Sequence, residues 1–182
     1  RGLGDVYKRQ GFDSFKCGED MDVPQTEEHG YVSDDSDFEQ IIWEFEHKDE
    51  STPLFLFNVT IQNHGSYTVE DYPAEVQLAD EPGAYPKAEQ YLTLANKTDE
   101  AFKKLIDYFS AQTEPTILVM FGDHQPSVEQ EFLDKAYGVT QDEMTMAQYM
   151  DKFKVPFIIW ANYPLTGDST KITSLNFLAQ YV

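Results

Sequence analysis

The sequence predicts an α/β fold in which a mainly parallel sheet is sandwiched by helices. Three short and strongly apolar runs, 54–61, 116–121 and 155–160, have the length and the β-branched and aromatic content of buried strands. Segments with the i, i+3, i+4 spacing of amphipathic helices lie between these runs. Strands that alternate with helices are typical of parallel sheets, because each helix returns the chain to the same end of the sheet.

The first predicted helix spans about 35–48. Residues 11–33 before it are polar and interrupted by glycine and proline, and they predict a loop with short extended pieces. Ser33 and the acids that follow it are typical of a helix N-terminus. The apolar residues of this helix have helical spacing: Phe38, Ile41, Ile42 and Phe45.

A long connection follows the predicted strand 54–61. Residues 65–86 are rich in proline, glycine and tyrosine, and loops of this length are often functional. The apolar spacing of 86–112 then predicts one long helix or two abutting ones.

The C-terminal part continues the alternation. After the predicted strand 116–121, helical stretches are expected near 128–137 and 145–152, ahead of the predicted strand 155–160. A last helix is expected from about Thr173.

Composition excludes several classes of function. The 182 residues contain 33 Asp and Glu against 13 Lys and Arg, a net charge of -20, which would repel nucleic acid. With 41% hydrophobic and 14% aromatic residues, the chain can bury a core and is expected to fold. Its single cysteine, Cys17, cannot form an internal disulfide, and no apolar run is long enough for a membrane helix.

Residues 1–10 differ from the rest of the chain, because they contain three basic residues and one acidic residue. They resemble a translated library-adapter sequence of the kind found at the ends of open reading frames from metagenomic assemblies, and a native basic tail is the alternative. We therefore expect a non-native segment at 1–10 and a partial catalytic domain at 11–182.

The most specific local pattern is Gly122-Asp123-His124, directly after the predicted strand 116–121. Ligands of open α/β sheets gather at the carboxyl ends of strands. Asp123 and His124 can reach one centre only if the strand has ended before them, which Gly122 and Pro126 favour. Carboxylate oxygen with imidazole nitrogen suits Zn, Mn or Fe. A solvated or purely structural pair remains open from the residues alone.

His64 follows the other strongly apolar run, 54–61. It could bind or protonate a phosphate oxygen, or it could be a partly exposed histidine that ends a strand. If the two strands run parallel, His64, Asp123 and His124 follow them at the same edge of the sheet. Together these three side chains indicate a site more strongly than His64 or the Asp123–His124 pair does alone.

Other polar residues have structural interpretations. His47 is expected at the C-terminal end of a helix, where the helix dipole favours it. Asp34 and Asp35 are expected to cap a helix. Thr60 lies inside a predicted strand without a neighbouring base, so it is not expected to be a nucleophile.

Three blocks, 56–65, 91–102 and 116–126, resemble in order and spacing the lipoteichoic acid synthase and phosphoglycerol transferase branch of the sulfatase family, within the alkaline phosphatase superfamily. Val32-Ser-Asp34 and 155–160 fit the same pattern, so the resemblance covers 11–182. It implies that the chain is the C-terminal part of a sulfatase domain.

The resemblance also implies a function. Such enzymes move glycerophosphate from phosphatidylglycerol, or a similar lipid headgroup, to the hydroxyl of a polyol or glycolipid acceptor, through a glycerophosphoryl intermediate on a threonine. Asp123 and His124 match the metal-binding pair, with manganese expected first and zinc or magnesium as alternatives. His64 matches the histidine that contacts the substrate phosphate. The implied location is the extracellular face of the bacterial cytoplasmic membrane.

Some features of the branch have no counterpart in the sequence. The threonine nucleophile and the membrane helices are expected upstream of Gly11, so no catalytic residue is assigned here and the fragment is expected to be inactive alone. Gly30-Tyr31 stands where the branch usually has Trp-Gly, which leaves headgroup specificity open. The alternatives are a sulfatase or phosphodiesterase of the same superfamily, and a non-catalytic acidic domain that binds cations.

Overall fold

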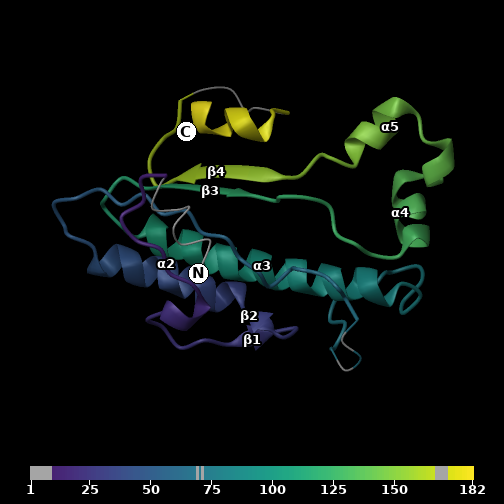
Figure 1. The fold of residues 1–182 in the computed structure, drawn as a ribbon, viewed down its shortest axis with the longest axis horizontal. Coiled ribbons are helices and arrows are strands. Elements are labelled where there is room, and N and C mark those ends of the chain that lie inside the picture. The colour runs from purple at the N-terminus through teal and green to yellow at the C-terminus, as the bar shows by residue number, and fades with distance from the viewer. Residues whose placement is uncertain (1–9, 69, 71, 167–171) are drawn as a thin grey trace. The chain divides into compact units, whose positions relative to one another are not determined.

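A computed structural model describes residues 10–68, 70, 72–166 and 172–182 (Figure 1). The chain divides into two compact units, one formed by residues 1–64 and 94–105 and the other by 65–93 and 106–182. Of the expected adapter-derived segment 1–10, only Gln10 lies within the described residues.

The first unit contains a small antiparallel hairpin and helix α2. Strands β1 (Glu27–Glu28) and β2 (Tyr31–Val32) pair antiparallel. The two residues between them, His29 and Gly30, have φ of 58° and 85°, the left-handed conformation that a tight hairpin turn of two residues requires. A short 3₁₀ helix, η1 (Gly18–Asp20), precedes the hairpin.

Helix α2 (Asp34–His47) confirms the first predicted helix. Its N-cap is Ser33, whose Oγ accepts a hydrogen bond from the backbone N–H of Ser36 at 3.1 Å. Phe38 of α2 packs edge-on against Phe102, with ring centroids 6.2 Å apart. These rings and the buried side chains of Leu94, Ala101 and Leu105 form the core of the first unit.

Helix α3 (Pro86–Ser110) is the single long helix among the two alternatives that the sequence allowed. Proline is favoured in the first turn, because it lacks an N–H that would have no partner there. Residues 94–105 of α3 belong to the first unit, and its two ends belong to the second. Four buried hydrophobic residues mark the core of the second unit: Tyr67, Ala88, Phe109 and Leu178.

Strands β3 (Ile117–Phe121) and β4 (Phe157–Ala161) confirm the positions of two predicted strands (Figure 1). They pair antiparallel, with Ile117 opposite Ala161 and Phe121 opposite Phe157, so the expected parallel pairing is corrected for these two strands. Apolar runs indicate burial but not strand direction. Antiparallel strands are common in otherwise parallel sheets.

The connection between β3 and β4 contains α4 (Gln130–Tyr137), the 3₁₀ helix η2 (Gln141–Glu143) and α5 (Met146–Asp151). Helices α4 and α5 confirm the two short helices expected there. The predicted C-terminal helix is instead a 3₁₀ helix, η3 (Leu175–Gln180).

The predicted buried strand 54–61 is not formed in the described part of the chain. Its side chains are largely exposed, with Phe55 at 77% and Val59 at 67%. An apolar run becomes a strand only where a neighbouring strand takes up its backbone hydrogen bonds, and the described residues supply no such neighbour.

None of the helices in the described residues is long and apolar enough to cross a membrane.

Candidate functional site

Asp123 and His124 lie where the sequence places them, directly after β3. The backbone N–H of Gly122 still bonds to the carbonyl of Pro156 at 3.2 Å, and the chain then leaves the strand. A Cβ at position 122 would lie 3.4 Å from the Cβ of Val155, an ordinary van der Waals contact. Both side chains are open to solvent, Asp123 at 83% and His124 at 74% exposure.

The two side chains converge. His124 Nε2 lies 3.4 Å from Asp123 Oδ2, and the backbone N–H of His124 donates to Asp123 Oδ1 at 2.8 Å. His124 Nδ1 lies 2.9 Å from the carbonyl oxygen of Gln125. Because a carbonyl oxygen only accepts, this contact requires the proton on Nδ1, which leaves the lone pair of a neutral ring on Nε2.

This arrangement fits one side of a metal centre. Metal-bound histidines usually donate their other ring N–H to a carbonyl or carboxylate, as His124 does to Gln125. His124 Nε2 and Asp123 Oδ2 lie 3.4 Å apart, close enough for both atoms to approach one ion. In residues 10–68, 70, 72–166 and 172–182, no group of three His, Cys, Asp or Glu side chains could hold a metal.

The loop that carries the pair is tied at both ends. Gln125 Nε2 donates to the carbonyl of Lys154, just before β4. Farther along, the carboxylate of Glu129 accepts the backbone N–H groups of Lys87 and Ala88 at 2.8 and 3.0 Å. Glu129 thereby caps the N-terminus of α3 from a distant part of the sequence.

Tyr67 is a buried member of the same unit as Asp123. Its ring packs edge-on against Tyr91 with centroids 5.6 Å apart, and 4% of the residue is exposed. Burial, then the neighbouring Tyr91 and the charge of Asp123, raise the pKa of Tyr67 to about 12. Its phenol is therefore neutral at physiological pH.

His64, in the first unit, lies in a turn in which its backbone N–H donates to the carbonyl of Ile61 at 2.9 Å. The residue is exposed, and its ring meets the edge of Tyr31 on β2, with centroids 5.8 Å apart. Tyr31 is the position at which the sequence departs from the Trp-Gly pattern. An aromatic contact to His64 is therefore supplied by this tyrosine.

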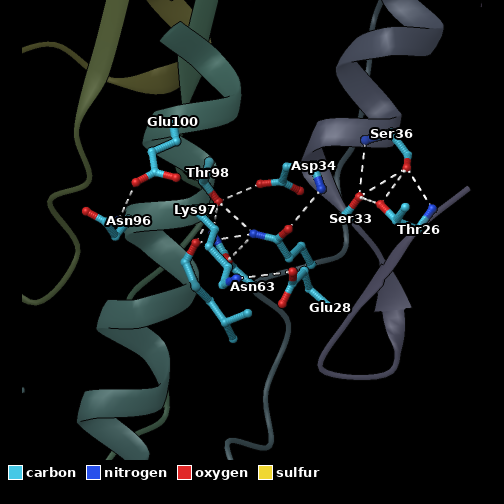
Figure 2. Close-up of polar contacts among 12 residues, drawn as sticks. Thr26, Glu28, Ser33, Asp34, Ser36, Asn63, Asn96, Lys97, Thr98 and Glu100 are labelled. Carbon is cyan, nitrogen blue, oxygen red and sulfur yellow. Dashed lines mark hydrogen bonds and ion pairs between the residues drawn. The ribbon is translucent and has the colours of Figure 1, made fainter. Parts of the chain in front are cut away.

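The two residues before His64 belong to a buried polar network that sequence analysis did not predict (Figure 2). Thr98 Oγ1 on α3 donates to Asp34 Oδ2 at 2.6 Å and accepts from Asn63 Nδ2 at 2.8 Å. Gln62 Oε1 accepts the backbone N–H of Asp34 at 3.0 Å. In the sequence, Thr98 falls on the apolar face of its helix, between Leu94 and Phe102. A polar residue at such a position indicates a buried hydrogen-bonding group.

The acids at the start of α2 do more than cap the helix. Asp34 is fully buried, and desolvation raises the pKa of its carboxyl group, whereas its interactions with Thr98 and Thr60 lower it. Burial, and then the charge of Asp34, raise the pKa of Asp37 to about 6. Two carboxyl groups with raised pKa values therefore lie in the first turn of α2.

Comparison with known proteins identifies relatives of this chain. The family model named Sulfatase matches residues 2–181, which confirms the family named from the sequence blocks. A protein of Rhizobium meliloti (strain 1021) assigned to cyclic β-1,2-glucan modification is 30% identical over 180 residues, which are 94% of this chain and 27% of that protein. The capsular polysaccharide biosynthesis protein RkpI of the same organism is 28% identical over 116 residues, 64% of this chain and 20% of that protein.

A solved structure confirms the fold class. The phosphoglycerol transferase GacH of Streptococcus pyogenes, in complex with sn-glycerol-1-phosphate, matches with a TM-score of 0.65 and 22% identity, over 87% of this chain and 39% of that one. This likeness shows an alkaline phosphatase-like α/β fold. The chain spans about a quarter of the length of the first relative and less than half of the solved structure.

Proposed function

Because this chain belongs to the sulfatase family, we propose that it is part of a metal-dependent phosphoglycerol transferase. The enzyme would move glycerophosphate from phosphatidylglycerol, or a similar headgroup, to a hydroxyl of a polyol or glycolipid acceptor. The observation that carries the proposal is the convergence of Asp123 and His124 in the geometry of a metal-binding pair. The fold shared with a phosphoglycerol transferase that binds sn-glycerol-1-phosphate supports the choice of substrate.

Each residue has a defined role in the proposal. Asp123 and His124 hold the metal, with manganese expected first. The bound metal would lower the pKa of a nucleophilic hydroxyl and offset negative charge on the phosphoryl oxygens. His64 donates a hydrogen bond to a phosphate oxygen and does not itself bind the metal. The nucleophile is proposed to be a threonine in a segment N-terminal to Gly11.

The proposed location is the extracellular face of a bacterial cytoplasmic membrane. Attachment there would come from membrane helices outside this chain. The net charge of -20 would not by itself draw the protein to anionic headgroups, so attachment has to be imposed separately.

A hydrolase of the same family, a sulfatase or phosphodiesterase, is the second candidate. It is favoured by the name of the matching family and would use the same Asp123–His124 pair. The fate of the transferred group separates the two activities. A transferase passes labelled glycerophosphate to an acceptor alcohol, whereas a hydrolase releases it to water at the same rate whether or not the acceptor is present.

Manganese titration of the complete gene product tests the metal site. We expect Asp123→Asn and His124→Gln each to weaken manganese binding at least about 100-fold, because each removes one of few ligands. Asp142→Asn is the matched control, since it removes an exposed carboxylate from the connection between β3 and β4. If the two variants bound manganese like the control, the metal site would be refuted. If they lost manganese but the intact enzyme turned over no lipid headgroup, a non-catalytic cation-binding domain would be the better interpretation.

A further inference from the structure

We propose that Thr98 is a positioning residue for His64, through hydrogen bonds that fix the 62–64 segment between α2 and α3. The proposal rests on the function proposed for His64 as a phosphate-binding residue. It concerns how the fold holds that imidazole, and it assigns no contact between Thr98 and substrate.

Thr98 both donates and accepts hydrogen bonds. Its hydroxyl lies 2.6 Å from Asp34 Oδ2 and 3.1 Å from the carbonyl oxygen of Leu94, so its one proton is directed to these two acceptors. The oxygen of Thr98 then has its lone pairs available for the amide nitrogens of Asn63, at 2.8 Å, and Gln62, at 3.2 Å. Thr98 is buried, with 6% of the residue exposed. Its hydroxyl connects α2 to the segment that ends in His64 (Figure 2).

Gln62 adds a second connection between the same elements. Its Nε2 donates to the carbonyl of Leu94 on α3 at 3.2 Å, and its Oε1 accepts from the backbone of Asp34 at 3.0 Å. The residue is 1% exposed. The backbone of residues 62 and 63 is therefore held to both helices by largely buried side chains, whose hydrogen bonds are costly to leave unmade.

The ring of His64 is oriented by a neighbour tied to the same place. Tyr31, whose ring meets that of His64, lies in β2, two residues before the N-cap Ser33. The backbone N–H of Ser33 bonds to the carbonyl of Thr26, which secures the hairpin beside the start of α2. Residues 62 and 63, which precede His64, and Tyr31, whose ring contacts it, are therefore both held near the N-terminus of α2.

The test measures dissociation constants for sn-glycerol-1-phosphate, and kcat and KM for lipid turnover, with the complete gene product. Thr98→Val keeps the shape of the side chain and removes the hydroxyl. We expect about a tenfold weaker affinity and a matching rise in KM, because a small displacement of a binding group lowers affinity by this order. Manganese affinity should be unchanged, and Thr98→Ser should restore wild-type values.

Thr93→Val is the matched control. Thr93 is also buried on α3, at 1% exposure, and its hydroxyl bonds to the carbonyl of Glu89 and the backbone N–H of Val76. It should lower the thermal midpoint about as much as Thr98→Val without weakening phosphate binding. Asn63→Ala, which removes one arm of the network at a half-buried residue, gives a second route should Thr98→Val fold poorly. We expect it also to raise KM.

The outcomes separate this inference from the function beneath it. If His64→Ala bound sn-glycerol-1-phosphate as tightly as the wild type, the role proposed for His64 would be wrong. If His64→Ala weakened binding while Thr98→Val and Asn63→Ala did not, His64 would keep its role and the positioning role of Thr98 would be refuted. Equal losses of affinity in Thr98→Val and Thr93→Val would also refute it, because they would indicate general loosening of the fold.

Discussion

Replacing Asp37 by asparagine should stabilise this protein at neutral pH. Asp37 lies in the first turns of α2, where a carboxylate is normally favourable. Here burial, and then the charge of buried Asp34, raise its pKa from 3.8 to about 6. The folded protein therefore binds the proton of Asp37 more tightly than the unfolded chain does, and ionised Asp37 destabilises the fold at pH 7.

The magnitude follows from the two pKa values. A difference of about 2 in pKa corresponds to about 3 kcal/mol of unfolding free energy. Asparagine also gives up the interaction of a charge with the helix N-terminus, worth about 0.3–1 kcal/mol. We therefore expect Asp37→Asn to raise the unfolding free energy by about 2 kcal/mol at pH 7.

The pH dependence gives the sign. The stabilising effect of protonated Asp37 is fully present below pH 3.8 and is lost as the pH rises through 6, so the advantage of the variant should appear across that interval. Asp34, whose pKa is also raised, acts in the same direction. Acids with lowered pKa values, such as Asp22 and Asp49, lose their stabilising effect at lower pH, below their ordinary value of 3.8.

Urea unfolding of both proteins at a series of pH values from 4 to 7 measures this effect. Asp35→Asn is the control, because Asp35 is a more exposed neighbour that pairs with Lys104 at 2.6 Å and should give no gain. A difference between Asp37→Asn and wild type that stayed constant from pH 4 to pH 7 would refute the reasoning. So would a variant less stable than the wild type at pH 7.

Two further predictions concern the second unit. Asn162 accepts the backbone N–H of Thr116 and donates to carbonyls at the end of α3 and before β3. Asn162→Leu should therefore cost about 1 kcal/mol, because it removes hydrogen bonds to partly exposed backbone groups, and a thermal midpoint equal to the wild type would contradict this. Glu129→Ala should cost about 1 kcal/mol by uncapping α3, and Glu129→Gln, which keeps one acceptor oxygen, should lose less. Urea unfolding checks that order, and equal stability of all three proteins would argue against the cap.

Local patterns predicted the parts of the fold that depend on local physics. Ser33 ahead of a helical apolar stripe marked the start of α2, and Pro86 marked the start of α3, because capping and periodicity are properties of consecutive residues. The end of β3 before Asp123 was also predictable from Gly122 and Pro126. That early end is what allows neighbouring residues 123 and 124 to converge.

Partners distant in the sequence account for what was not predicted. The antiparallel pairing of β3 and β4 depends on the path of the chain between them. The apolar runs do not indicate the direction in which their strands run. The run 54–61 has the composition of a strand, yet strand formation needs a hydrogen-bonding neighbour. Likewise Asp34 and Thr98 are 64 residues apart, and only the packing of α2 against α3 shows that the acid expected to cap a helix belongs to a buried network.

The acidity of the chain constrains how it could recognise an anionic group. In the first unit the lysines nearest the network of Thr98 are already engaged, Lys97 with Glu28 at 3.2 Å and Lys104 with Asp35 at 2.6 Å. Each pair is close to neutral, so neither lysine offers a free positive charge to a phosphate. Under the proposed function, a directed hydrogen bond from His64 would then matter more for phosphate recognition than these two lysines. A bound cation would offset part of the net charge of -20, so the proposed metal ligands Asp123 and His124 would serve binding as well as chemistry.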